Sequence, residues 1–584
     1  IPMNEPFILN LTHPLFDAIT VTIEPETHTP GRVARRRVAT ALRQVLQQPV
    51  KGWHVRQVPH SPRLAYDLTP PDEITLTVQE AWNLTYALRE LPDVAEADPS
   101  FIVIQDAIPE LEPDTAPIAK AAAARAARSF ESCLDDAAPE SADPNELEWS
   151  PHLVDAPCAW QVEPDEGGKR KGEGIRVGHP DSGYLLHPEL FDDPSGLSRR
   201  ILTNLERDFV DLDPEARDKN GYHGLSTSCI IVSSELTGSI TGVAPAAELV
   251  SLRVTKPHPF GIPAPILFGS GARNLRDAIR YAVYEADCHV ISISLGWFAY
   301  GPLHDAVIEA ERNNVIVCAA AGNYTGIVIW PAAYPEAVAV AGCNASRGPW
   351  GGSAQGVQVA VSAPAENVWV PTFRHDGSPT QHQSNGTSFA VATVAGVAAL
   401  WLAYHNREKL LERYRDEFTL TDVFRYVLGQ SSDPFAGFVG NGFGSGIVNA
   451  RRVLKTPLPT ITELQRALPP RPKARAAAVA PSPLATIAAA FPDVPEATLR
   501  ERLATLMNVD ESELEARLAD VEDEVLFHLV TDPALRAQIT GQLPVPVARA
   551  KAATEPTPIP AVRGALATDP LSDRLRQRMG TVAE

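Results

Sequence analysis

The sequence has no excess of basic residues. Its 584 residues include 51 Lys and Arg against 72 Asp and Glu, which gives a formal net charge of −21. A protein that binds DNA or RNA must neutralise phosphates with clustered cations, so we do not expect nucleic acid as a partner. The same charge argues against an anionic membrane surface. An acidic balance of this size mainly keeps a chain soluble.

The sequence also lacks the apolar segments that direct or anchor a protein. The chain begins Ile1-Pro2-Met3 and shows no basic head followed by an apolar stretch, the pattern of a secretory signal peptide. No run has the length and composition of a transmembrane helix. We therefore expect a cytoplasmic location, with secretion after processing as the alternative.

Cysteine is scarce and follows no recognisable pattern. The six cysteines show neither paired spacing nor the spacing of a metal site, and most fall in segments expected in the core. We interpret them as reduced thiols that pack as small apolar side chains, in agreement with a reducing compartment. They are Cys133, Cys158, Cys229, Cys288, Cys318 and Cys343.

Four segments carry the residue types of acyl transfer. Ser388 opens a long apolar run, which predicts a buried helix whose free N–H groups favour a developing negative charge beside the serine. Asp181 follows a strand-like run, and His223 opens another helical run. A nucleophile, a base and an orienting carboxylate form a catalytic triad. Asn323 closes a third apolar run, and its amide with the Ser388 N–H would form an oxyanion hole.

The segments between these residues alternate in type. Short β-branched runs at 174–179, 248–254, 289–295, 315–320 and 338–342 are separated by helical patterns such as 275–285 and 303–312. Such alternation predicts a doubly wound, mostly parallel α/β sheet with helices on both faces. Ligands bind such sheets at the carboxyl ends of the strands, where Asp181 and Asn323 are expected.

These stretches resemble the subtilisin (subtilase) family of serine endopeptidases. The order Asp181, His223, Ser388 is the order found in that family. The resemblance covers residues 148–456, the expected catalytic domain. The motifs are VGHPDSG at 177–183, HPEL at 187–190, YHG at 222–224, GVAP at 242–245, VISISLG at 290–296, AAGN at 320–323, WPA at 330–332 and NGTS at 385–388.

The resemblance implies how a peptide or protein substrate binds. An extended peptide would pair with two backbone edges, and Ile329 would form the floor of the primary specificity pocket. A smaller residue is frequent there in the family, so we expect a shortened pocket that prefers small or medium apolar side chains. The substrate-binding residues implied are Ser294, Leu295, Gly296, Gly269, Ser270, Gly271, Ala320, Gly322 and Ile329.

No cofactor or metal is expected to be needed for catalysis. Structural calcium is common in the resembled family, but the chain has no clustered loop of oxygen ligands. Glu189, which matches a family carboxylate, is one candidate ligand. A surface carboxylate without an ion is the alternative.

Residues 1–106 form a separate α+β unit. The expected order of strand, helix, strand, strand, helix, strand is the ferredoxin-like split βαβ arrangement. Residues 87–99 resemble the last helix and strand of subtilase propeptides, which implies an intramolecular inhibitor. An unrelated accessory domain is the alternative. The following segment, 107–147, is rich in Ala, Pro, Asp and Glu, and is expected to be a flexible linker with a possible self-cleavage site.

The chain continues beyond the resemblance. Residues 457–486 are rich in Pro and Ala and predict a linker. Apolar residues at helical spacing predict a small helical module at 487–543. A role in binding a protein partner and a role as a packing appendage both remain open. Residues 544–584 are a Pro-rich tail with one possible short helix.

Two functions are compatible with these features. The first is a serine endopeptidase that hydrolyses peptide bonds through an acyl-enzyme and is made as a self-inhibited zymogen. The second is a catalytically shut, protease-like binding or adaptor protein. The complete set of four catalytic residues favours the first, because a binding scaffold has no need of them.

Overall fold

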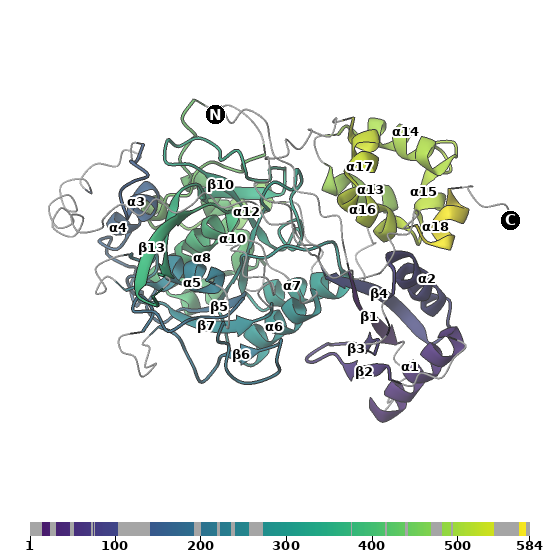
Figure 1. Ribbon diagram of the computed structural model, residues 1–584. Coiled ribbons are helices and arrows are strands. Elements are labelled where there is room, and N and C mark those ends of the chain that lie inside the picture. The colour runs from purple at the N-terminus through teal and green to yellow at the C-terminus, as the bar shows by residue number, and fades with distance from the viewer. Residues whose placement is uncertain are drawn as a thin grey trace.

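The structure is a computed structural model with three packed bodies (Figure 1). They are a central α/β domain, an N-terminal α+β domain and a C-terminal helical module. The structure describes residues 15–23, 31–46, 52–71, 74, 76–102, 133, 141–191, 200–218, 222–234, 240–255, 272–374, 376–414, 417–437, 442–468, 482–491, 494–541 and 571–579.

A seven-stranded sheet forms the centre of the large domain. Its order is β11-β10-β9-β8-β5-β7-β6, and all its pairings are parallel. Most residues of these strands are buried because both faces of the sheet are covered. The strands are β5 (Arg176–Asp181), β6 (Arg207–Asp208), β7 (Glu248–Arg253), β8 (Val290–Ile293), β9 (Ile316–Ala320), β10 (Val338–Cys343) and β11 (Val359–Pro364).

Alternate residues of each strand enter two different cores. Val290 and Ile316 pack in the cluster that contains α5 (His223–Val232) and α8 (Thr387–Tyr404), whereas Ile291 packs in the cluster with the helices of the other face. This division follows from the two-residue period of a strand. It confirms the doubly wound α/β fold. The helices on the second face are α6 (Ala272–Tyr284) and α7 (Gly301–Arg312).

The longest helix of the described residues is the core of this domain. The expectation that no run has the length and composition of a transmembrane helix is wrong for α8, which has both. It is nevertheless buried along its whole length inside the protein. A helix that is apolar all round is typical of such a position. The remaining elements of the domain are α3 (Trp149–Leu153), α4 (Ala156–Ala159), β12 (Val368–Phe373), β13 (Pro379–Ser384), α9 (Arg407–Tyr414), α10 (Leu420–Ser431) and α11 (Ala450–Lys455).

The N-terminal domain has the predicted order of strands and helices, although the sequence did not indicate its second strand, β2. Its antiparallel sheet has the order β2-β3-β1-β4, and its two helices share an apolar cluster with the sheet. The other sheet face lies against α6 and α7, where Asp67 bonds to Arg276. The elements are β1 (Leu15–Ile23), α1 (Gly31–Leu46), β2 (His54–Gln57), β3 (Leu64–Thr69), α2 (Val78–Arg89) and β4 (Val94–Ile102).

The segment predicted as a Pro- and Ala-rich linker, 457–486, contains a helix. Thr460 and Glu463 form a capping box that starts α12 (Ile461–Ala467), and Leu464 is buried in the core of the central domain. The Pro- and Ala-rich composition does not reveal a capping box or a single buried leucine, so the helix was not predicted. The helical module also begins earlier than predicted, at α13 (Pro483–Ala490). It continues with α14 (Glu496–Met507), α15 (Leu514–Leu518), α16 (Glu522–Thr531), α17 (Pro533–Thr540) and, from the tail, α18 (Asp573–Arg578).

The described end of the predicted linker 107–147 is held in place. The carbonyl of Pro144 accepts hydrogen bonds from Trp369 Nε1 (3.0 Å) and Gln383 Nε2 (2.6 Å). Apart from Cys133, residues 103–140 lie outside the described residues, and so does any self-cleavage site within them.

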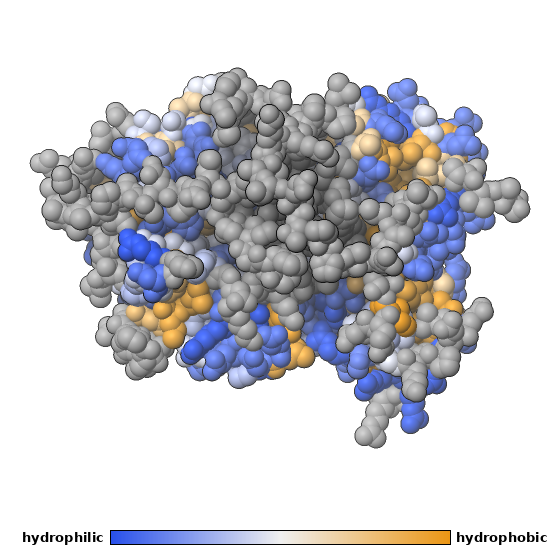
Figure 2. Space-filling model, in the orientation of Figure 1, coloured by the Kyte–Doolittle hydropathy of each residue, from blue (hydrophilic) through white to orange (hydrophobic). Residues whose placement is uncertain are grey.

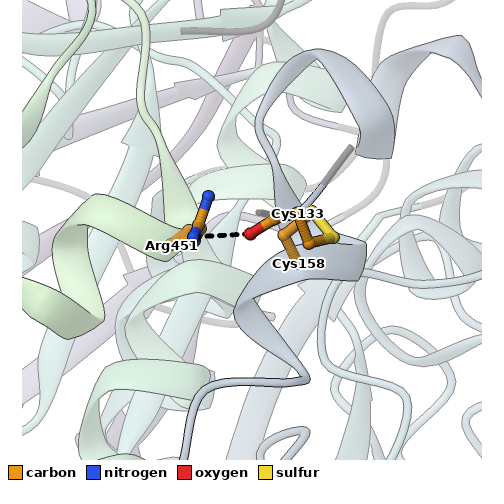
Figure 3. Close-up of a disulfide and its surroundings, with 3 residues drawn as sticks. All are labelled: Cys133, Cys158 and Arg451. Atoms are coloured by element: carbon orange, nitrogen blue, oxygen red, sulfur yellow. Dashed lines mark hydrogen bonds between the residues drawn. A yellow bond between two sulfur atoms is a disulfide. The ribbon is translucent and has the colours of Figure 1, made fainter. Parts of the chain in front are cut away.

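Two cysteines form a disulfide, which corrects the prediction that all six are reduced. Cys133 pairs with Cys158, and the Cys133 carbonyl accepts a 2.7 Å bond from Arg451 Nη2 (Figure 3). The pairing joins the predicted linker to α4, so no spacing rule could reveal it. The other four cysteines are free and buried, as expected: Cys229, Cys288, Cys318 and Cys343.

The visible surface of the described residues is mostly hydrophilic. Hydrophilic residues cover most of the coloured area in Figure 2, and hydrophobic ones gather in separate patches, among them patches on the helical module and the N-terminal domain. This face offers no continuous apolar surface over the described residues.

Candidate active site

Asp181 and His223 form a close, buried pair at the carboxyl end of the sheet. Asp181 ends β5 and is fully buried, and its Oδ1 lies 2.8 Å from His223 Nδ1. The Ser182 N–H donates to the same oxygen at 2.6 Å. Burial raises the pKa of the Asp181 carboxyl, but attraction to His223 outweighs it and the pKa is lowered overall. Burial likewise opposes the charged His223, yet Asp181 raises its pKa.

The loop after Asp181 and the start of α5 are locked together. The Ser182 hydroxyl donates to Asp218 Oδ2 (2.6 Å) and accepts from the Gly224 N–H (3.1 Å). A Cβ at Gly224 would lie 1.9 Å from the Gly183 carbonyl oxygen, so only glycine permits this approach. The glycine that follows His223 therefore sets the distance between the base and its carboxylate.

Ser388 lies in the first turn of α8 and is 5% exposed. Its hydroxyl donates to the Ser294 carbonyl at 3.4 Å, and Ser294 Oγ donates to the Ser388 carbonyl at 3.1 Å. Among the described residues His223 Nε2 is buried and has no hydrogen-bond partner. In this structure the Ser388 hydroxyl is therefore bonded to Ser294 and not to His223 Nε2.

Asn323 is oriented by a residue that the sequence did not single out. Its Oδ1 accepts from the Thr387 N–H (2.8 Å) and from Thr387 Oγ1 (2.7 Å). These two donors fix which end of the amide is oxygen, so Nδ2 is directed away from Thr387 and is available to an oxyanion. The only sequence signal was that Thr387 directly precedes the expected nucleophile.

The predicted pocket residues lie around one side chain. A Cβ at Gly296 would meet Ile329 Cδ1 at 1.8 Å, and one at Gly322 would meet it at 3.1 Å. Ile329 therefore lies between the two predicted walls. Ser294 and Leu295 follow β8, and Ala320 ends β9. The other predicted edge, Gly269, Ser270 and Gly271, lies outside the described residues.

Glu189 is buried, so the alternative that it is a surface carboxylate is wrong. It is 2% exposed and accepts hydrogen bonds from Ser233 Oγ (2.6 Å) and the Ile240 N–H (3.3 Å). It ties the end of α5 to the next segment. A second group of carboxylates, formed by Asp208, Asp211 and Asp213, is close enough for a cation. Arg253 already pairs with Asp208 and Asp211.

Comparisons with known proteins agree with this geometry. Residues 172–433 match the model of the subtilase family. The chain is 29% identical over 314 residues to the major intracellular serine protease of Bacillus subtilis (strain 168), covering 52% of this chain and 88% of the relative. It is 32% identical over 232 residues to subtilisin Savinase of Lederbergia lenta, covering 39% and 76%. It is 28% identical over 313 residues to thermitase of Thermoactinomyces vulgaris, covering 53% and 96%.

Proposed function

The chain belongs to the subtilase family and is a serine endopeptidase, and on that premise we propose that Asp181, His223 and Ser388 are its catalytic triad. The observation that carries the assignment is the 2.8 Å contact between His223 Nδ1 and Asp181 Oδ1. Ser388 lies in the first turn of α8, which packs against the helix that begins at His223. Its place at the carboxyl end of parallel strands is where such folds bind ligands.

The proposed mechanism is acyl transfer. Ser388 Oγ attacks the peptide carbonyl carbon while its proton passes to His223 Nε2, and Asp181 stabilises the resulting imidazolium. The same proton then passes to the amine that leaves when the peptide C–N bond breaks. Water then hydrolyses the acyl-enzyme: His223 accepts a proton from the water and returns it to Ser388 Oγ as the acyl group leaves. Asn323 Nδ2 and the Ser388 N–H would stabilise the oxyanion in both steps.

Covalent labelling tests this assignment. We expect a serine-directed phosphonate to add to Ser388 in the wild type and not in Ser388→Ala, with peptide hydrolysis following the same pattern. Asn323→Ala should keep the label but lower kcat by about 100-fold to 1,000-fold. A wild type that stays unlabelled even after its N-terminal domain is removed would instead favour the shut, protease-like binding protein.

The N-terminal domain is proposed as an intramolecular inhibitor, so that the protein is made as a zymogen. The support is its buried polar contact with the central domain. Asp67 and Arg276 are both fully buried and form two bonds of 2.9 Å. Arg273 makes two bonds of 2.7 Å with Asp17. Moving the two domains apart would first leave these buried charges without their partners, which is costly. The pairs therefore favour a docked N-terminal domain.

The helical module supports the same proposal, because its partner is the chain's own N-terminal domain. The Phe527 ring of α16 lies 4.7 Å from Phe101 and 6.0 Å from Trp82 of the N-terminal domain, and 5.0 Å from Phe298 of the central domain (centroid distances). Tyr86 donates a 3.0 Å bond to Glu524 of α16. Through Phe527 the module thus contacts both the N-terminal domain and the central domain.

Residues 571–579, named here the clasp, complete this contact. The clasp includes α18 and returns to α2 of the N-terminal domain (Figure 1). Asp573 accepts bonds from Gln79 (3.2 Å) and Asn83 (2.9 Å), and Ser572 bonds to the buried Glu524. We propose that the clasp and the module regulate the release of the inhibitor.

The location of the protein is proposed from its cysteines. Disulfides persist in oxidising compartments and are rare in the cytosol. The Cys133–Cys158 pair therefore favours the secreted alternative over the cytoplasmic one, although two relatives are named as intracellular. Alkylation of the protein in its native source without reductant would test this: four blocked cysteines agree with secretion, and six blocked cysteines contradict it.

A further inference from the structure

The second carboxylate oxygen of Asp181 faces away from His223. Oδ1 accepts from His223 and Ser182, as described above. Oδ2 accepts a 3.3 Å hydrogen bond from Thr227 Oγ1 and lies 3.7 Å from His179 Nε2. Thr227 and His179 play no part in the acyl-transfer steps.

Strand and helix periods bring these two side chains to the carboxylate. His179 precedes Asp181 by two residues on β5, so both side chains lie on the same sheet face. Thr227 follows His223 by four residues on α5, so both lie on the same helix face. Each element therefore supplies one catalytic residue and one residue behind it.

His179 and Thr227 form a buried polar pair in direct contact. Both side chains are 0% exposed, and His179 Nε2 lies 2.9 Å from Thr227 Oγ1. His179 Nδ1 lies 3.3 Å from Ser228 Oγ. A buried imidazole with both nitrogens contacted is held in one orientation, and a polar pair at this depth is costly unless its hydrogen bonds are made.

The burial keeps His179 neutral while the enzyme works. Burial lowers the pKa of His179 to about 4 although Asp181 opposes the shift. A neutral imidazole has one donor and one acceptor nitrogen. The Ser228 hydroxyl can donate to Nδ1, which leaves Nε2–H to donate to Thr227 and the Thr227 hydroxyl to donate to Asp181 Oδ2. The Thr227 hydroxyl also lies 3.0 Å from the His223 carbonyl, but a carboxylate is the stronger acceptor.

We propose that His179 and Thr227 are positioning residues of the triad, which deliver a hydrogen bond to Asp181 Oδ2 and thereby set the basicity of His223. The bond fixes the rotation of the carboxylate. It also takes up part of the negative charge, which weakens the attraction of Asp181 for the His223 proton. The proposal rests on the proposed triad. The other titratable group facing His223 is Asp218, which is joined through Ser182.

Thr227→Val tests the proposal because it removes the donor and keeps the volume. Without the bond, charge concentrates on the carboxylate and the imidazolium is stabilised. We therefore expect the pKa of His223 to rise by roughly half a unit. In turnover the acid limb of kcat/KM should move to higher pH by the same amount. The kcat should fall by on the order of tenfold, with little change in KM.

The His223 titration is measured by NMR of histidine-labelled, full-length Ser388→Ala protein, so that the test does not require turnover. Thr227→Ser should restore the wild-type titration because it keeps the hydroxyl. Thr393→Val is the matched control, since Thr393 is also a buried helical threonine but donates only to a helix carbonyl, that of Phe389. It should leave the titration unchanged.

The double variant His179→Val with Thr227→Val separates positioning from packing. It replaces both members of the His179–Thr227 contact by apolar residues, so that neither is left unpaired by the loss of the other. We expect it to unfold at a temperature close to that of the wild type but to keep the raised pKa of His223. A wild-type titration in the double variant or in Thr227→Val would overturn the proposal. If the pKa of His223 shifts as expected but a phosphonate does not label the wild type, the result counts against the proposed triad instead.

Discussion

At the scale of single residues, the catalytic groups depend on neighbours that hold them in one orientation. Asn323 shows this most directly, because its amide oxygen accepts two bonds from Thr387. One of these comes from the backbone N–H and survives every substitution except that by proline, whereas the other comes from the hydroxyl. The hydroxyl is therefore the part of the oxyanion-hole geometry that can be tested by mutation.

Thr387→Val should lower kcat by about tenfold, because Asn323 keeps only one of two bonds and its Nδ2 is less well directed toward the oxyanion. KM should change little, since the oxyanion exists only in the transition state. Steady-state kinetics with a peptide substrate measure both constants. Thr387→Ser is the control and should behave as the wild type; equal losses in the two variants would contradict this account.

In the proposed specificity pocket, Ile329 determines the length. Its Cδ1 fills the space beside Gly296 and Gly322. Ile329→Ala should therefore shift preference before the cleaved bond from small or medium apolar side chains to Phe or Tyr. A gain of about tenfold in kcat/KM for Phe over Ala is expected from the added apolar contact. A peptide library scan measures it, and a wild type that already prefers Phe would refute the short pocket.

At the scale of elements, contacts between α2 and the clasp decide how firmly the N-terminal domain is held. Asp573 of α18 receives hydrogen bonds from two residues of α2, and Arg574 pairs with Glu90 at the end of that helix. Exposed pairs of this kind contribute little individually. Their effect is to position Leu575, which is 2% exposed, against the apolar cluster of the module.

Asn83→Asp places a carboxylate against Asp573 and should loosen the clasp by like-charge repulsion. Hydrogen exchange of full-length Ser388→Ala protein should then be faster in α2 by a few-fold. Adding Asp573→Asn again pairs a carboxylate with an amide, and it should restore the protection of α2 from hydrogen exchange. Arg500→Ala removes an exposed pair with Glu496 elsewhere in the module and serves as the control. Unchanged exchange in Asn83→Asp would show that the clasp does not hold α2.

At the scale of the whole molecule, the three bodies meet around Asp98 of β4. Its side chain is only 18% exposed and lies 3.6 Å from Arg89. A Cβ at Gly301, the first residue of α7, would be 3.3 Å from Asp98 Oδ1. Burial, with Asp523 of the module and two further carboxylates, raises the pKa of Asp98 to about 7 in spite of Arg89.

This carboxyl should make docking of the N-terminal domain depend on pH. Its pKa in the assembled protein lies above the ordinary value of 3.8, so the assembled form holds the proton more tightly. Stability from this group is therefore present at low pH and is lost as pH rises through about 7. Asp98→Asn should remove most of the difference.

Limited proteolysis of Ser388→Ala protein by an added protease measures the effect. The N-terminal domain should be released faster at about pH 8 than at about pH 6 in the wild type, and at similar rates in Asp98→Asn. Glu163→Gln, on an exposed side chain that pairs with Arg170, is the control. An undiminished pH dependence in Asp98→Asn would assign it to another group.

Features that depend on neighbouring residues could be predicted from the sequence, whereas contacts between distant residues could not. The alternating runs determined the α/β sheet and the split βαβ order, because strand and helix patterns repeat within a few residues. The sequence likewise singled out Asp181, His223, Asn323 and Ser388, since each directly follows or opens a patterned segment. These features need no knowledge of what each residue touches.

Only the tertiary structure decided which distant residues meet. Tyr86 and Glu524 are 438 residues apart when they bond, and His179 reaches Thr227 across 48. The Cys133–Cys158 disulfide belongs to the same class. Such contacts leave no repeating pattern in the sequence, because the type of each residue already suits the helix or strand in which it lies. The sequence by itself therefore determined the elements and the chemistry of the triad, and packing decided its supporting contacts and the hold on the N-terminal domain.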